Sequence, residues 1–296
     1  MEMWRYASEL KQALPYQKLP FHHFPNKEGY YCGVNITTNS SGFRDYEYDT
    51  GGKNNKKRLI FLGDSFTLGW GVPLDDLYSK QLGKMLNKKS NDYEVINMGI
   101  GNYNSTMEIE LFKWKGLKLN PDTAILMYFI NDTEPIPKKK SLVCYVTMKH
   151  SYFFSFLFDR FIKLKSRFVK NFGWSEYYQQ LYSPENSKNL VSTKESIREL
   201  IKLCNENNVK LLIVNIPEFH RFKEYPFPYA TEYIRNLASE ANVPFLDLLP
   251  SFINYPPESL WVSSEDPHAN AKANFIIAQQ IYKKIMQDKF LSSLLQ

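Results

Sequence analysis

The chain has 296 residues, of which 43% are apolar, 23% charged and 16% aromatic. These proportions are typical of globular proteins and exclude a disordered chain of low hydrophobicity. The length allows one large α/β domain or two small ones, and either could bury a substantial core. The cysteines Cys32, Cys144 and Cys204 are odd in number and far apart, which excludes a disulfide scaffold and argues against a thiolate zinc site.

The chain shows no sign of export or membrane insertion. Its N-terminus, MEMWRYASELKQ, lacks the apolar run of a signal peptide, and no stretch reaches the roughly 18 apolar residues that a membrane-spanning helix needs. We therefore expect a soluble cytoplasmic protein, and the low cysteine content agrees with a reducing compartment.

The formal net charge of +6 is local. Residues 138–174 contain nine basic residues and one acidic residue, Asp159, so this segment alone carries +8 and the rest of the chain is slightly acidic. No nucleic-acid recognition motif accompanies the charge, and we expect no nucleic-acid partner.

In chain order, residues 1–57 are interpreted as an N-terminal extension that ends in the polar stretch GGKNNKK. Short apolar runs then alternate with segments of helical spacing. The runs predicted as strands are 58–63, 93–98, 123–130, 209–216 and 243–248. The segments predicted as helices are 75–87, 105–117, 193–207, 229–241 and 270–289. Because the runs are nearly continuous, they are typical of parallel strands covered on both faces, and the alternation predicts a doubly wound α/β sheet.

Residues 134–189 interrupt this alternation and are interpreted as an insertion in a domain that spans 58–296. Apolar residues from 154 to 168 follow helical spacing, while four basic residues share another face of the same helix. One interpretation of 150–174 is a helix that packs its aromatic face on the domain. Others are peripheral contact with an anionic membrane and a lid over an acyl-chain site.

A candidate nucleophile follows the first predicted strand. Gly63-Asp64-Ser65 lies where that strand ends, and the carboxyl ends of parallel strands are where such sheets bind ligands. A serine hydroxyl needs a histidine base that is held by a carboxylate. Without such partners, Asp64 or Ser65 would be interpreted as a helix cap.

The best candidate for the base is His268. Asp266 lies two residues before it, and Pro267 favours an extended backbone in which both side chains project to the same side. The alternative interpretation is a surface loop before the last helix. Glu218 and His220 form a rival pair, without the extended bias that proline supplies.

Stabilisation of an oxyanion requires hydrogen-bond donors near the serine. The turn Gly99 to Asn104 follows the second strand and offers backbone N–H groups, and Asn131 follows the third strand and offers a side-chain amide. Each feature alone is typical of a turn, but three consecutive strand ends and a late Asp-x-His element together indicate an acyl-transfer site.

This arrangement resembles the SGNH, or GDSL, hydrolase family. Gly63-Asp64-Ser65 resembles the first block of the family, the Gly99 to Asn104 turn the second, Asn131 the third, and Asp266 with His268 the last. The upstream Asn39 to Arg44 segment resembles one that precedes the first block in many bacterial members. The resemblance implies a flavodoxin-like three-layer α/β/α sandwich with a parallel sheet of about five strands.

The implied catalytic residues are Ser65, Asp266 and His268, and the implied oxyanion hole consists of Ser65, Gly101, Asn102 and Asn131. Two positions depart from the family pattern. The usual oxyanion-hole glycine is replaced by Asn102, and the glycine two residues before the third-block asparagine is replaced by Phe129, which would narrow the pocket beside Asn131.

The resulting expectation is a serine esterase or acylhydrolase that acts on a small-molecule or glycan ester without a cofactor or metal. One alternative is an O-acyltransferase that passes the acyl group to a glycan or lipid through the same residues. Another is a catalytically silent binding module with the same fold. A flavin-binding protein would leave the Asp-x-His element without a purpose.

Overall fold

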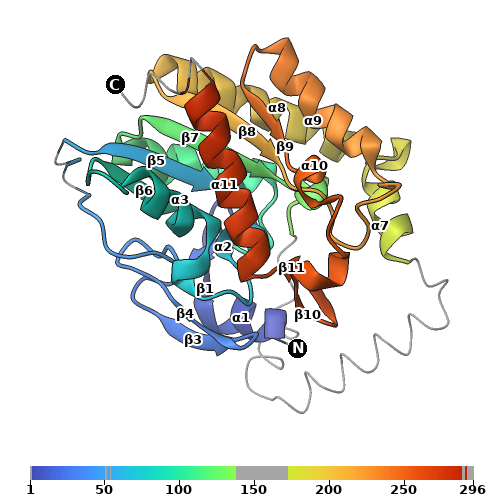
Figure 1. Cartoon of the computed structure of the whole chain (residues 1–296), viewed down its shortest axis with the longest axis horizontal. Coiled ribbons are helices and arrows are strands. Elements are labelled where there is room, and N and C mark those ends of the chain that lie inside the picture. Colours follow the sequence, from blue (N-terminus) through green and yellow to red (C-terminus); the bar gives the residue numbers. More distant parts are fainter. Residues whose placement is uncertain (1, 51, 54, 138–172, 289–290, 292–296) are drawn as a thin grey trace.

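The computed structural model describes residues 2–50, 52–53, 55–137, 173–288 and 291 (Figure 1). A five-stranded parallel sheet with the strand order β6-β5-β7-β8-β9 forms its centre. The strands are β5 (Lys57–Leu62), β6 (Tyr93–Asn97), β7 (Thr123–Tyr128), β8 (Lys210–Asn215) and β9 (Phe245–Asp247). The five apolar runs of the sequence form these strands, which confirms the predicted parallel sheet.

The central strands alternate their side chains between two apolar cores, which is why they are apolar at nearly every position. In β5, Leu59 and Phe61 belong to one core, and Ile60 and Leu62 to the other. Helices α3 (Tyr78–Leu86) and α11 (Ala271–Gln287) cover the first core, and α4 (Ser105–Leu111), α8 (Ser187–Glu206) and α9 (Pro228–Glu240) cover the second (Figure 1). The expected three-layer α/β/α sandwich is confirmed.

The strand order changes direction at β5. Strand β5 lies between β6 and β7, so the two following strands are on opposite sides of it, and ligands bind at such points of open α/β sheets. Helix α2 (Ser65–Leu68) begins at this point, directly after β5. Shorter elements lie elsewhere in the described chain: α7 (Trp174–Leu181), α10 (Leu249–Phe252), the 3₁₀ helices η1 (Leu74–Asp76), η3 (Leu117–Leu119), η4 (Ile130–Thr133), η5 (Pro184–Asn186) and η6 (Pro257–Leu260), the π-helical turn η2 (Phe112–Gly116), and the hairpin of β10 (Trp261–Ser263) and β11 (Asp266–Ala269).

The N-terminal segment folds onto the α/β layers. It consists of α1 (Glu2–Leu10) and two antiparallel hairpins, β1 (Lys11–Ala13) with β2 (Phe21–His23) and β3 (Glu28–Tyr31) with β4 (Val34–Thr37). Tyr6, Leu10 and Tyr31 pack with Leu68 and Trp70, which lie in and directly after α2. The segment therefore buries its apolar face against α2 and the residues that follow it.

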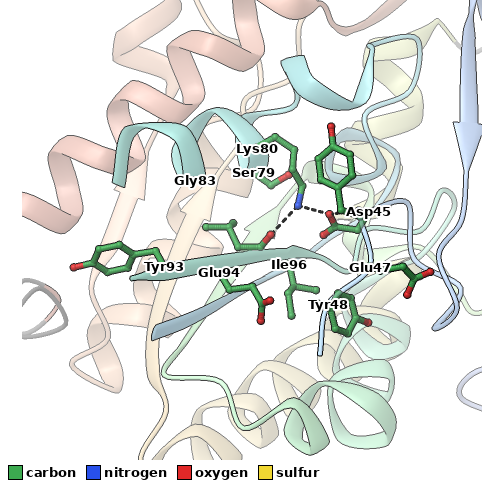
Figure 2. Close-up of a pocket in the computed structure, with 11 residues that line it drawn as sticks. Asp45, Glu47, Tyr48, Ser79, Lys80, Gly83, Tyr93, Glu94 and Ile96 are labelled. Carbon is green, nitrogen blue, oxygen red and sulfur yellow. Dashed lines mark hydrogen bonds and ion pairs between the residues drawn. The ribbon is translucent and has the colours of Figure 1, made fainter. Parts of the chain in front are cut away.

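The free edge of β6 is covered by a buried ion pair (Figure 2). Lys80 on α3 pairs with Asp45 and donates a hydrogen bond of 2.7 Å to the backbone carbonyl of Val95. The second Asp45 oxygen accepts the Asn97 N–H at 2.7 Å. Asp45, Lys80 and Val95 line a pocket of about 190 Å³. The two side chains satisfy backbone polar groups of β6, which protects this edge from pairing with another strand.

The basic segment 150–174 lies outside the described residues except for Gly173 and Trp174, and its interpretations stay predictions. Within the ranges that the structure describes, no helix combines the length and hydropathy that membrane crossing requires.

Candidate functional site

Ser65 is the first residue of α2 and follows β5 through a tight turn. The Asp64 side chain caps the helix by accepting the Phe66 N–H at 2.9 Å. A Cβ atom at Gly63 would lie 1.9 Å from the Thr67 hydroxyl, and one at Gly99 would lie 2.3 Å from the Leu68 backbone nitrogen. Glycine is therefore required at Gly63 within the turn and at Gly99 after β6, where the chain packs closely against α2. The turn holds Ser65 at the carboxyl end of the sheet.

The carbonyl end of α2 is fixed by a buried guanidinium group. Arg44 donates to the backbone oxygens of Leu68 at 3.0 Å, Gly69 at 2.6 Å and Val72 at 2.6 Å. The Asn39 side chain accepts the backbone N–H groups of Ser41 and Phe43 and so shapes the turn that leads to Arg44. The upstream segment singled out in the sequence thus clamps the helix that begins at Ser65.

Ser65, His268 and Asp266 form a continuous hydrogen-bonded chain. Ser65 Oγ lies 2.9 Å from His268 Nε2, and His268 Nδ1 lies 2.5 Å from Asp266 Oδ1. The same carboxylate oxygen accepts the backbone N–H of His268 at 3.1 Å. Since the carboxylate accepts from Nδ1–H, Nε2 of the neutral ring is the acceptor for the serine hydroxyl.

Asp266 is held by groups from other parts of the chain. Its Oδ2 atom accepts the indole N–H of Trp70 at 3.0 Å and lies 3.7 Å from the Cys32 thiol at the tip of the β3–β4 hairpin. Burial alone would raise the pKa of Asp266, but the hydrogen bonds and charge of His268, with the Trp70 hydrogen bond, lower it to about 2. The carboxylate is therefore ionised throughout the neutral range and can stabilise a protonated His268.

Three other carboxyl groups near the nucleophile have a raised pKa, in contrast to the lowered pKa of Asp266. Asp64, Glu108 and Asp132 are almost inaccessible to solvent, and burial raises the pKa of each of them. Asp64 lies beside Ser65, with its Oδ2 atom 3.4 Å from Ser65 Oγ, but the histidine contacts Asp266. Environment thus separates a structural carboxyl group from the one that orients the base.

The second-block turn has a backbone suited to the replaced glycine. Asn102 has φ of 66°, in the left-handed region that glycine favours and asparagine tolerates. The neighbouring Gly101 N–H donates to the Tyr6 hydroxyl at 3.0 Å, so it is already engaged within the protein. Asn131 is half-buried in η4, and its side chain hydrogen-bonds with Asp64.

Three residues of the N-terminal segment hold this turn, and no pattern in the sequence indicates them. The Tyr6 hydroxyl donates a hydrogen bond of 2.5 Å to His23 Nε2, and His23 Nδ1 donates one of 3.1 Å to the Gly42 carbonyl. Lys11 Nζ donates to the Gly101 carbonyl and, at 3.0 Å, to the Asn102 side-chain oxygen. Burial lowers the pKa of Lys11 and raises that of Tyr6. No motif marks Tyr6 and Lys11, because the turn that they bind lies 90 to 95 positions away in the sequence.

The rival pair from the sequence lies near this site but does not contact the serine. Glu218 accepts the backbone N–H of His220 at 2.9 Å and also pairs with its Nδ1 atom. The Ser65 hydroxyl is bonded to His268 instead. Among the residues that the structure covers, no group of three or more His, Cys, Asp or Glu side chains could hold a metal ion.

Comparison with known proteins identifies a family whose model matches most of this chain. A model described as the GDSL-like lipase/acylhydrolase family matches residues 61–274. Among solved structures, the acetyl xylan esterase AlAXEase is 18% identical, with 76% of this chain and 98% of that chain covered at a TM-score of 0.50. Axe2, an acetylxylan esterase from Geobacillus stearothermophilus, is 15% identical, with 80% and 98% covered at a TM-score of 0.50. These two likenesses show a shared fold. A search of curated proteins found no match.

The low pKa of Asp266 has a consequence for stability in acid. The pKa of Asp266 in the folded chain, about 2, is below the ordinary 3.8. The ionised carboxylate therefore stabilises the fold above pH 4. This contribution, about 2 kcal/mol, is lost as the pH falls towards 2. We expect the free energy of unfolding, measured with urea from pH 6 to 2, to fall less steeply in Asp266→Asn than in the wild type. Glu265→Gln, at an exposed neighbour, should follow the wild type. Parallel curves for Asp266→Asn and the wild type would contradict the assignment.

Proposed function

We propose that this chain, which belongs to the GDSL-like lipase/acylhydrolase family and hydrolyses ester bonds, acts through an acyl-enzyme. In this proposal the acyl group is carried by Ser65. The observation that carries this proposal is the hydrogen bond of 2.9 Å between Ser65 Oγ and His268 Nε2. A hydroxyl whose proton points to an oriented imidazole is an activated nucleophile.

In the proposed reaction, Ser65 Oγ attacks the ester carbonyl as His268 Nε2 takes its proton. Asp266 keeps the proton on Nδ1 and stabilises the imidazolium ion that forms. The imidazolium then protonates the leaving alkoxide oxygen as the ester C–O bond breaks, which leaves the acyl group on Ser65. A water molecule, deprotonated by the same imidazole, attacks this acyl group, and Ser65 recovers its proton when the acid leaves.

The proposed oxyanion hole has three donors. They are the backbone N–H groups of Ser65 and Asn102 and the side-chain amide of Asn131. The Gly101 N–H donates to the Tyr6 hydroxyl, and the Ser65 N–H hydrogen-bonds with the Asp64 carboxylate, so the Asn102 N–H is the stronger of the backbone candidates. The amide of Asn131 carries two N–H bonds, so its hydrogen bond with Asp64 leaves a second one for the substrate.

Aromatic packing beside the serine favours a short acyl group. Phe129, at the position where the family usually has glycine, is almost fully buried and its ring lies 4.5 Å from that of Phe66. Phe66 also contacts the His268 ring at 5.1 Å. These side chains occupy space next to Asn131. A short acyl group agrees with the acetyl esters named for AlAXEase and Axe2.

Ester hydrolysis by purified variants tests this function. We expect the wild type to hydrolyse p-nitrophenyl acetate faster than longer p-nitrophenyl esters. Ser65→Ala and His268→Ala should each lower kcat by at least about 10³-fold, because the nucleophile or its base is lost. Ser239→Ala, at an exposed serine on α9, serves as the control and should match the wild type. Full activity in folded Ser65→Ala would contradict the mechanism. Product analysis with an added sugar acceptor distinguishes hydrolysis from acyl transfer.

The N-terminal residues that hold the oxyanion turn should affect the rate more than binding. Lys11→Met removes both hydrogen bonds to the turn and leaves the Gly101 carbonyl and Asn102 side chain without this donor. We expect kcat for p-nitrophenyl acetate to fall by about 10- to 100-fold, somewhat less than the loss of a direct oxyanion donor, with KM nearly unchanged. Lys18→Met, at an exposed lysine of the same segment, is the control.

Kinetics should be measured at a temperature at which circular dichroism shows each variant to be folded. Equal kcat values for folded Lys11→Met and the wild type would contradict the positioning role.

A further inference from the structure

A second carboxylate-x-histidine element lies at the same end of the sheet as the first. Glu218 and His220 follow the carboxyl end of β8. The Glu218 carboxylate is 1% exposed, and it accepts both the backbone N–H of His220, at 2.9 Å, and the Nδ1 atom of its ring. Asp266 contacts the same two groups of His268, but through a single oxygen, Oδ1, whereas Glu218 uses one oxygen for each. Each of these two elements therefore orients an imidazole, and the imidazole of His268 is the one bonded to the nucleophile.

The His220 ring is fixed in orientation but remains open to solvent. Trp174 stacks on it with ring centroids 4.5 Å apart and planes at 9°, and Trp261 contacts it edge-on at 5.4 Å. The side chain nevertheless keeps 27% of its exposure. With Nδ1 bonded to Glu218, Nε2 of the neutral ring is a hydrogen-bond acceptor. A buried carboxylate thus orients an imidazole that remains partly exposed.

The His220 imidazole is linked to the proposed catalytic residues by a short series of side-chain and backbone contacts. Trp261 pairs with Ala269, the residue after His268, and its indole N–H donates to the Phe219 carbonyl at 2.8 Å. The Phe219 ring contacts Phe66 at 5.5 Å, and Phe66 contacts His268 at 5.1 Å. One aromatic side chain therefore separates His268 from the residue that precedes His220.

We propose that His220, flanked by Trp174 and Trp261, is a subsite for a hydroxyl-bearing alcohol part of the ester, such as a sugar or another polyol. This proposal rests on the proposed esterase function and names its substrate class. His220 Nε2 accepts a hydrogen bond from a substrate hydroxyl, and the neighbouring indoles pack against the carbon face of the same group. A simple alkyl or aryl alcohol has no hydroxyl left to donate, so it gains nothing from this imidazole.

Two esters with the same acyl group test the subsite. We compare p-nitrophenyl acetate with methyl β-xyloside that carries one acetyl group and two free hydroxyls. His220→Asn keeps an N–H donor near Nδ1 and removes Nε2. We expect KM for the sugar acetate to rise by about 5- to 10-fold, the usual effect of one hydrogen bond, with kcat/KM for p-nitrophenyl acetate within twofold of the wild type.

Two further variants control for folding and for general effects near the site. Arg221→Gln changes the exposed neighbour and should leave both esters unaffected. His220→Gln places an amide near Nε2 and should retain more of the sugar-acetate affinity than His220→Asn. If His220→Asn does not fold, the His220→Gln comparison with the wild type still applies, and an equal loss for both esters in that variant would overturn the proposal.

The outcomes separate this proposal from the proposed function. Hydrolysis of both esters by the wild type, with unchanged KM values in His220→Asn, overturns the subsite and leaves the esterase in place. An equal fall of kcat/KM for both esters in folded His220→Asn also overturns the subsite, because it indicates a structural role of His220. If the wild type hydrolyses neither ester, the esterase function itself fails, and the subsite fails with it.

Discussion

The hydrogen bond between Ser65 Oγ and His268 Nε2 is the contact on which the proposed chemistry depends. It joins residues 203 positions apart, so neither local sequence can position it alone. The parallel sheet provides the common frame, because β5 delivers Ser65 to its carboxyl edge and the β10–β11 hairpin delivers His268 to the same edge. Asp64 and Arg44 then fix the serine helix, and Asp266 with Trp70 fixes the histidine.

The N-terminal segment emerges as a part of this arrangement. Tyr6 and Lys11 bind the turn that contains Gly101 and Asn102, and Cys32 reaches the carboxylate of Asp266. Arg44 adds the clamp on α2. The family match starts at residue 61, so these contacts come from outside the matched domain. Residues that precede the α/β domain therefore contact both the proposed oxyanion turn and the carboxylate that orients His268.

Local patterns explain what could be predicted from the sequence. Apolar runs such as 123–130 predict buried parallel strands because both faces of β7 are covered, and Pro267 predicts the extended geometry that aligns Asp266 with His268. Tyr6, Lys11 and Trp70 carry no such pattern. Their partners are distant in sequence, and each residue type is as common in a core or on a surface as in a site. The element boundaries were also set by tertiary contacts. Helix α8 begins at Ser187, six residues before the predicted start, where η5 leads directly into it.

Covalent labelling of Ser65 tests the central claim most directly. The purified protein is treated with a fluorophosphonate, which phosphonylates activated serines, and the product is identified by intact mass and peptide mapping. The account predicts one phosphonyl group per chain, on Ser65, with labelling abolished in Ser65→Ala and strongly slowed in His268→Ala. A folded protein that hydrolyses esters while Ser65 stays unlabelled, or that is labelled equally fast without His268, would contradict it.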